Sequence, residues 1–381
     1  MIIQSKRVWV GSQFSPMQIE VNDGKITAFY AYGEKSCDAD YGDQRIVPGF
    51  IDVHTHGAYG FDTNDANPEG LRNWMRNITE EGVTGICPTT ITQSHEVLSN
   101  AVKNVANVVK EGYEGAEILG IHFEGPYLDM VKKGAQPEQY IVKGTIEEFK
   151  QYQDDANGLI KIVTMACEHD NNFELTRYLA NTGVRVSMGH SASDYNTALL
   201  AVANGAAGLT HTHNGMSNYT HRGGDGGLVN VALRFKDTFA EIICDGHHVS
   251  WAALNTFFTC KANGTGIIVT DSLLAKGLPT GTHFMFGGNE TEIWEDGTAH
   301  VCATQGLAGS TLKVNQGLRN LVEYANVPFD VALDACTYNP ARYLGVDDRK
   351  GRLHVGYDAD IVVLADNYDV VQTYAKGIAQ K

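Results

Sequence analysis

The sequence has no long hydrophobic run and few positive charges, and each absence excludes a class of protein. No apolar run approaches the roughly 20 residues of a membrane-spanning helix, and the N-terminal stretch lacks the apolar core of a signal peptide. Lys and Arg number 29 against 45 Asp and Glu, which gives a formal net charge of −16. So acidic a chain is a poor candidate for binding nucleic acid or an anionic membrane surface. We therefore expect a cytoplasmic protein that binds neither nucleic acid nor membrane.

The cysteine pattern excludes two further classes. The seven cysteines are scattered and odd in number, and no CxxC pair occurs. The sequence therefore indicates neither a disulfide framework nor a cysteine-based zinc ribbon. Cys87, Cys167 and Cys244 lie in apolar runs, so we expect them to be buried thiols.

Both ends of the chain read as short strands. Asp23-Gly24 separates two alternating runs, which is typical of a hairpin, and the last stretch of the chain returns to the same style. A chain of 381 residues is long enough for two domains, or for one large barrel with an appendage. We predict a small β-sandwich domain built from residues 1–47 and 346–381, and a catalytic domain over residues 48–345.

The middle of the chain alternates short apolar runs with helix-like segments. Eight apolar runs of buried-strand length occur, and residues 71–82 and 95–112 between them have apolar residues at spacings of three and four. Eight strand–helix units predict an α/β fold, a (β/α)8 TIM-like metal-dependent hydrolase barrel, with a doubly wound open sheet as the alternative. After the eighth run we expect a hairpin over residues 291–302 and helices over 312–326 and 329–345.

Five of the eight runs end in side chains that could bind a metal or a proton. These side chains are His54 and His56, Glu124, His190, His211 and Asp271. The carboxyl ends of barrel strands meet at one face, so these residues should converge there. Residues two apart in a strand point the same way, and the His-x-His pair therefore suits a divalent metal. Asp271 is the candidate base, because a carboxylate beside a metal-activated water can take its proton.

Other interpretations remain open at each of these positions. Glu124 could pair with a nearby Lys or Arg, and Asp271 could cap the next helix or orient a histidine. His122, two residues before Glu124, could be a hydrogen-bond partner of a ligand and not a ligand itself. His213 could replace His211 as the ligand, although it lies further into its loop.

Two segments contain basic side chains that could bind an anionic ligand near the predicted site. Arg222 lies in a glycine-rich loop, where backbone N–H groups and a guanidinium can bind phosphate. His248 follows the seventh run. A solvated loop arginine is the alternative interpretation of Arg222.

Taken in order, the segments HTHG, HFEGPYL, GHS, THTHNGM, DGHH, VTD and LAGS resemble the N-acetylglucosamine-6-phosphate deacetylase family of the amidohydrolase superfamily. The resemblance runs over nearly the whole chain. It implies that Glu124, His190 and His211 are the principal metal ligands and that Asp271 is the catalytic acid/base. It also implies that His54 and His56 form a pair kept by only some members. The substrate-binding positions that it implies are Ala135, Asn214, Gly215, Arg222, His248, Leu307, Ala308 and Gly309.

The family's reaction implies hydrolysis of N-acetylglucosamine 6-phosphate to glucosamine 6-phosphate and acetate, in amino-sugar catabolism and recycling. The cofactor would be one or two divalent ions of zinc, iron, cobalt or nickel. The family is usually dimeric with its site near the interface, and His248 is expected to reach the phosphate bound in the partner subunit. His122 is one candidate for steadying the oxyanion. His213 is a departure, because aromatic residues are common at its position.

Two other functions compete with this interpretation. A relative that hydrolyses cyclic imides, as dihydroorotases do, often bridges two metals with a modified Lys on the fourth strand. Here Lys161 lies too early in the fourth run, and Glu124 offers a bridging carboxylate instead. A metal-free scaffold on a barrel is disfavoured, because such proteins typically lose their ligands. We therefore expect one ion on His54, His56 and Glu124, and another on Glu124, His190 and His211, with a single-ion centre as the alternative.

Overall fold

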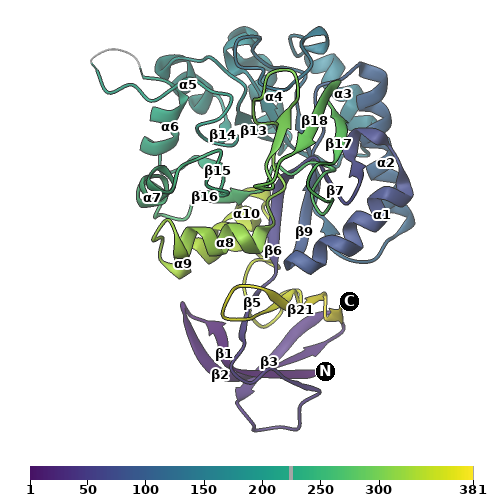
Figure 1. Cartoon of the computed structure of the whole chain (residues 1–381), viewed down its shortest axis with the longest axis vertical. Coiled ribbons are helices and arrows are strands. Elements are labelled where there is room, and N and C mark those ends of the chain that lie inside the picture. The colour runs from purple at the N-terminus through teal and green to yellow at the C-terminus, as the bar shows by residue number, and fades with distance from the viewer. Residues whose placement is uncertain (223–225, 381) are drawn as a thin grey trace.

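The structure, a computed structural model, describes residues 1–222 and 226–380. It consists of a large α/β body and, beside it, a smaller layer of strands that contains both termini (Figure 1). No helix in the described ranges is both long and apolar enough to cross a membrane.

The smaller layer is a single sheet built from the two ends of the chain. Its strands run in the order β22-β21-β20-β5-β1-β2-β3, and β4 pairs with β1. The predicted hairpin is confirmed, because Asn22 pairs with Lys25 across Asp23-Gly24. The two ends meet where β5 and β20 pair antiparallel, with Ile46 opposite Val363. The strand bounds are β1 Ile2–Val10, β2 Gln13–Asn22, β3 Lys25–Ala31, β4 Ala39–Asp40, β5 Arg45–Pro48, β20 Ile361–Leu364, β21 Val370–Ala375 and β22 Ile378–Ala379.

The larger body contains parallel strands at all eight predicted runs. They form a three-stranded ladder, β10-β9-β6, and a six-stranded ladder from β11 to β16. The third run is split into β10 and β11 around Gly120, where a Cβ would come within 2.3 Å of Cγ of Lys161. The strands are β6 Phe50–Thr55, β9 Val83–Pro88, β10 Glu117–Ile118, β11 Ile121–Glu124, β12 Ile160–Met165, β13 Arg185–Met188, β14 Ala206–Leu209, β15 Phe239–Ile243 and β16 Gly266–Val269.

Backbone contacts join the two ladders at both of their edges. A parallel bridge pairs Thr89 with His122 on one side. On the other side Asp271 N donates to His54 O at 2.8 Å, and His56 N donates to Ser272 O at 2.8 Å. The carboxyl ends of the first and last strands are therefore neighbours, and this is a mixed α/β architecture of the TIM-barrel type.

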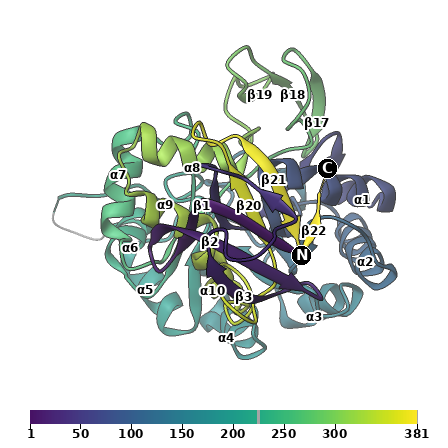
Figure 2. The ribbon, with the colours of Figure 1, turned by 90° about the horizontal axis from the view of Figure 1, so that it is seen from below.

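Helices follow the strands and cover the outside of the ladders (Figure 2). The predicted helix after the first strand begins at Pro68, capped by the Asn67 side chain, and buries Leu71, Trp74 and Met75. The helices are α1 Pro68–Asn77, α2 His95–Glu111, α3 Ile146–Asp155, α4 Glu174–Asn181, α5 Tyr195–Ala203, α6 Leu228–Arg234, α7 Trp251–Cys260, α8 Val314–Glu323, α9 Phe329–Cys336 and α10 Tyr338–Leu344. The single helix expected over 329–345 is wrong. It is broken at Thr337, because the ring of Pro340 would clash with the carbonyl of Cys336.

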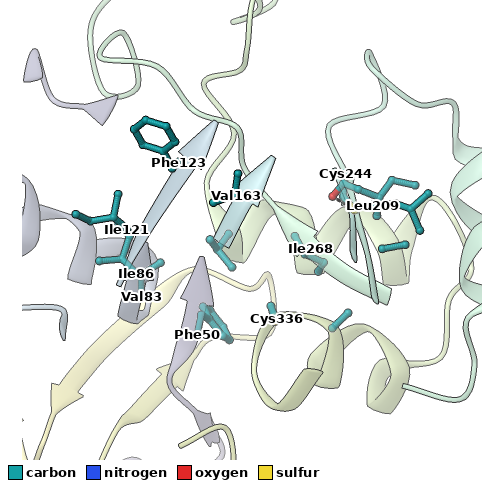
Figure 3. Packing of buried hydrophobic residues seen from close by; sticks show 14 of the residues in the cluster. Phe50, Val83, Ile86, Ile121, Phe123, Val163, Leu209, Cys244, Ile268 and Cys336 are labelled. Carbon is teal, nitrogen blue, oxygen red and sulfur yellow. Dashed lines mark hydrogen bonds between the residues drawn. The ribbon is translucent and has the colours of Figure 1, made fainter. Parts of the chain in front are cut away.

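Strand and helix side chains pack into a continuous apolar core (Figure 3). Phe50, Ile86, Ile121 and Ile268 come from four different strands and are 0% exposed. Cys87, Cys167 and Cys244 are buried free thiols, as expected.

A small antiparallel sheet after β16 stands over the edge of the barrel. It comprises β17 His283–Phe286, β18 Asn289–Ile293 and β19 Ala299–Val301, and β18–β19 confirms the predicted hairpin. Its inner face buries Phe286 and Ile293 against Leu273 and Ala308. We call these three strands the flap sheet.

Candidate active site

The candidate site lies at the carboxyl ends of the parallel strands. His54 lies within β6 and Glu124 is the last residue of β11. His190, His211 and Asp271 each follow the end of their strand by two residues and have φ angles of 46°, 29° and 49°. Left-handed backbone is uncommon outside glycine, although His and Asp adopt it more often than most residues, and it clusters at functional sites. The backbone at these positions is therefore strained where it turns the side chains inward.

Glu124 lies at the centre of four imidazoles. Its Oε1 atom is 3.4 Å from Nε2 of His54, 3.4 Å from Nε2 of His190 and 3.3 Å from Nε2 of His211. Its Oε2 atom is 3.3 Å from Nε2 of His56. Ligands about 2.0–2.1 Å from a tetrahedral ion lie roughly 3.3–3.4 Å from one another. The spacing of these donor atoms is therefore that of a metal coordination shell.

The protonation pattern of the same atoms fits a cation. Nδ1 of His190 is 2.9 Å from the carbonyl oxygen of Lys132, and Nδ1 of His54 is 2.9 Å from Oε2 of Glu241. In the neutral imidazole each Nδ1 donates to its acceptor, which leaves the Nε2 atom with a lone pair that can bind a metal ion. Nε2 of His54 and Oε1 of Glu124 are buried without a hydrogen-bond partner. Such orphaned acceptors are costly, and an ion between them would satisfy both.

The electrostatics of the cluster also call for positive charge. Burial alone lowers the pKa of His54, but the carboxylates of Glu124, Asp271 and Glu241 outweigh burial and raise it to about 9. Burial is likewise outweighed at His56, where hydrogen bonds to Asp271 and Glu124 raise the pKa to about 10. The carboxylates thus hold protons on buried imidazoles, and a metal ion can supply the same positive charge.

Asp271 lies beside the histidine pair and faces the cavity. Its Oδ1 atom is 3.1 Å from Nε2 of His56 and 3.4 Å from Nε2 of His54. Its side chain is 12% exposed, against 1% for Glu124. Burial raises the pKa of Asp271, but the charges of His54 and His56 outweigh it and hold the pKa at about 2. The carboxylate is ionised at neutral pH and free to accept a proton.

A cavity of about 170 Å³ opens over this cluster. Drug-sized ligands occupy roughly 300–1,000 Å³, so this cavity suits a smaller ligand. Seven residues expected from sequence to contact substrate line its walls: Ala135, Asn214, Gly215, His248, Leu307, Ala308 and Gly309. The structure therefore brings these residues together with the donor cluster.

The two expected phosphate-binding cations lie in different places. His248 lines the cavity of its own chain, with Nδ1 2.6 Å from Oδ2 of Asp245. Asp245 thus holds the ring at the cavity of its own chain, and the expected reach of His248 to the phosphate of a partner subunit stays a prediction. Arg222 is exposed and does not line this cavity. Residues 223–225, which follow it in the sequence, lie outside the described residues.

A larger depression of about 780 Å³ lies apart from this chemistry. His213, Tyr195 and Arg234 line it, and no carboxylate is among its described lining residues. We take the smaller cavity as the candidate site, because the side chains around Glu124 and the carboxylate of Asp271 face it together. His213 points to the larger depression, whereas His211 reaches Glu124.

His122 is neither a ligand nor an oxyanion donor in this arrangement. Its Nδ1 atom is 3.0 Å from the carbonyl oxygen of Val53, and its Nε2 atom is 2.7 Å from Oγ1 of Thr164. The ring packs beside His54 with centroids 4.5 Å apart. The suggestion that His122 steadies the oxyanion is therefore wrong, because both of its nitrogens are already engaged.

Two residues of the site were missed by the sequence analysis. Glu241 lies in β15, is 1% exposed, and orients His54 through the Nδ1 contact described above. A lone carboxylate in an apolar strand was its signal. Gln136 donates from Nε2 to Oε2 of Glu124 at 2.7 Å and accepts from Thr92 N at 2.8 Å. Its loop position gave no signal in the sequence.

Comparisons with known proteins agree with this geometry. The Amidohydrolase family matches residues 45–379. N-acetylglucosamine-6-phosphate deacetylase of Bacillus subtilis (strain 168) is 37% identical over 94% of this chain and 91% of its own length. N-acetylgalactosamine-6-phosphate deacetylase of Escherichia coli O157:H7 is 34% identical over 94% of this chain and 93% of its own. Among solved structures, the chain is similar to a mutant N-acetyl-D-glucosamine-6-phosphate deacetylase from Mycobacterium smegmatis, in complex with N-acetyl-D-glucosamine-6-phosphate. The two chains are 26% identical and superpose with a TM-score of 0.93, and the match covers 100% of this chain and 98% of that one. The chain therefore belongs to the amidohydrolase family, among the N-acetylglucosamine-6-phosphate deacetylases.

Proposed function

We propose that the protein hydrolyses N-acetylglucosamine 6-phosphate to glucosamine 6-phosphate and acetate, a step in amino-sugar catabolism and recycling. One observation carries the proposal: Asp271, the seven substrate positions and four of the five donor side chains face a single cavity. The donor cluster comprises Glu124, His56, His190, His211 and the fully buried His54. The relatives named above act on the same class of N-acetylated sugar phosphate. A cavity of about 170 Å³ suits one sugar and not a polymer.

The donor cluster would hold one or two divalent ions. Two groups of ligand atoms share Glu124: one adds His54 and His56, and the other adds His190 and His211. We favour two ions with Glu124 as the bridge. Imidazole and carboxylate donors suit zinc, iron, cobalt or nickel. A bound ion supplies a Lewis acid that lowers the pKa of water and polarises a carbonyl.

Asp271 would carry the proton through the reaction. Its ionised Oδ1 accepts a proton from the attacking water as the water oxygen adds to the acetyl carbon. Asp271 then returns that proton to the amide nitrogen as the C–N bond breaks, so that the amine leaves neutral. Glu241 and Gln136 keep His54 and Glu124 in place, which preserves the spacing of the donors during these steps.

The phosphate would be bound by His248 and Arg222. His248 reaches the cavity of its own chain, whereas Arg222 is exposed away from it. In a homodimer with the site near the interface, Arg222 of one subunit would complete the phosphate site of the other. A guanidinium binds phosphate in bidentate fashion, which would offset the strongly acidic charge of the chain.

The finer organisation of the chain belongs to the same proposal. Residues 1–47 and 346–381 form the small domain, whose arrangement as a sandwich stays a prediction, and residues 48–345 form a closed (β/α)8 barrel. The backbone bonds at both ladder edges support closure. A cytoplasmic location remains a prediction.

Acetate release from a sugar panel tests the proposal. The panel contains N-acetylglucosamine 6-phosphate, N-acetylgalactosamine 6-phosphate and free N-acetylglucosamine, with metal content measured on the same sample. We expect the first sugar to be the best substrate, and activity to disappear on chelation and return with a divalent ion. A clear preference for the galactosamine derivative would move the protein to the chemistry of its Escherichia coli relative. No acetate from any phosphorylated sugar with a loaded centre would refute the proposal.

A further inference from the structure

The outer face of the flap sheet gathers metal-binding side chains away from the active site. Alternation along a strand turns Phe286, Ile293 and Val301 inward, where they are at most 7% exposed. The same alternation turns His283 and Glu290 outward, with side chains 53% and 62% exposed. Figure 2 shows this sheet projecting beyond the ring of helices, so its outer face is open.

Strands β17 and β18 and the residue directly after β19 each contribute one donor to a single cluster. Nδ1 of His283 on β17 is 3.2 Å from Oε1 of Glu290 on β18. Cys302 directly follows β19, and its backbone N donates to Glu290 O at 2.8 Å, which fixes it opposite Glu290. Ligand atoms of His283, Glu290 and Cys302 all lie within 4.8 Å of one another. The sheet register therefore sets imidazole, carboxylate and thiol around one point.

Neighbouring groups determine which atoms are available. His300 is engaged at both nitrogens, 2.8 Å from Thr298 Oγ1 and 3.0 Å from Gln305 O, and is excluded as a ligand. Glu292 adds a second carboxylate, with Oε1 3.8 Å from Nε2 of His283. Cys302 is a free, partly exposed cysteine. The cluster thus contains two carboxylates, and His283 is its one basic side chain among the residues that the structure describes.

We propose that this outer face binds one zinc-class divalent ion through His283, Glu290 and Cys302. Thiolate and imidazole ligands select zinc or cobalt over the hard cations magnesium and calcium. Water or a neighbouring carboxylate completes the tetrahedron. Desolvation and the carboxylates of Glu290 and Glu292 raise the pKa of Cys302, so binding releases the thiol proton.

The bound ion would brace the wall of the catalytic cavity. Phe286, on the inner face, lines that cavity, and its ring centroid is 5.5 Å from that of His56. Asn289, in the same sheet, donates from Nδ2 to Ala135 O at 3.2 Å. Because the ion takes one ligand from each strand, it ties together the three strands that support these contacts.

Cobalt spectroscopy of the full chain separates this site from the catalytic one. The catalytic cluster has only nitrogen and oxygen donors, so an intense near-ultraviolet thiolate-to-cobalt band reports cysteine ligation alone. We expect the band in chelated protein titrated with Co²⁺, and its loss on adding Zn²⁺. Cys302→Ser should abolish the band and remove one ion per chain while acetate release persists. His283→Gln should weaken the affinity at least tenfold.

Cys260→Ser is the matched control, because Cys260 is also a partly exposed free cysteine but lies on α7. It should leave the band intact. Absence of the band in wild type, or its survival in Cys302→Ser, would overturn the site. Amide hydrogen exchange over residues 283–302 should slow when the ion binds in wild type and not in Cys302→Ser. Unchanged exchange in wild type would overturn the bracing role.

Discussion

Asp271 occupies a backbone conformation that few residues adopt easily, and this makes one substitution especially informative. Its φ angle is 49°, a region that asparagine tolerates well. Asp271→Asn therefore preserves shape and backbone while removing the base. We expect turnover to fall by about 10²–10⁴-fold, the usual contribution of acid–base catalysis. Steady-state acetate release checks this, with metal content and melting temperature unchanged. Near-normal turnover at full metal content would exclude Asp271 as the base.

At the same scale, the sequence predicted residues whose position in a strand reveals them. His54, Glu124, His190 and His211 end apolar runs, and a polar side chain there has to be paired or functional. Gln136 could not be found in this way, because it reaches Glu124 from a long loop whose path depends on tertiary packing. The position of Arg222 could not be predicted for the same reason. Contacts between residues distant in sequence decide whether such a loop residue faces the cavity.

Elements were predictable where local pattern and packing agree. Alternating or continuous apolar runs located the parallel strands, and apolar residues at spacings of three and four located the first helices between them. Prediction failed where one residue overrides a longer pattern. Pro340 divides the last helical segment at Thr337. The third run is also divided, because β10 pairs with β9 whereas β11 pairs with β12.

The number of metal ions in the site depends on the histidine pair at the end of β6. His54 and His56 lie on one side of this element, and each faces Glu124 at 3.3–3.4 Å. Replacing them with Gln and Asn removes one donor group and leaves Glu124 with the other two histidines. We expect metal content to fall from about two ions per chain towards one, as measured by elemental analysis.

An Asn64→Ala variant provides a control for this double substitution, because Asn64 supports the loop after β9 through Ile91 without belonging to the donor cluster. It should keep the wild-type metal content. A content near one ion in both wild type and the double variant would contradict the bridge and indicate a mononuclear centre.

Across the whole molecule, ion pairs join the barrel to the returning end of the chain. Glu117 on β10 is 3.0 Å from Arg349, 2.8 Å from Lys350 and 3.1 Å from Lys376. Lys350 is 1% exposed and keeps a second partner in Asp360. Breaking a fully buried pair costs about 3–5 kcal/mol. Because partners remain, we expect Glu117→Gln to lower the free energy of unfolding by about 1–2 kcal/mol, measured by urea titration at pH 7.

The pH dependence of that loss identifies its origin. Burial raises the pKa of Glu117, but Arg349 and Lys350 outweigh burial and lower it to about 2. A depressed carboxyl pKa stabilises the fold above its unfolded value and loses that effect as the pH falls towards the folded one. The difference between wild type and Glu117→Gln should therefore shrink between pH 4.5 and pH 2. A difference that stays constant with pH would mean that packing, and not charge, is responsible.

Removal of the metal should make the folded protein less stable at alkaline pH. In the metal-free chain the pKa values of His54 and His56 rise from 6.5 to about 9 and about 10. Between these limits the folded state holds protons that the unfolded chain has released, so stability falls as the pH rises. We expect the melting temperature of chelated protein to drop by several degrees between pH 7 and pH 9.5, relative to metal-loaded protein. The metal-loaded protein is the control, because an ion bound to the same nitrogens excludes those protons. Other titrating groups contribute equally to the chelated and the loaded protein; one is Lys261, whose pKa burial lowers to about 8. Parallel melting profiles of the two forms would show that the carboxylates do not hold protons on this histidine pair.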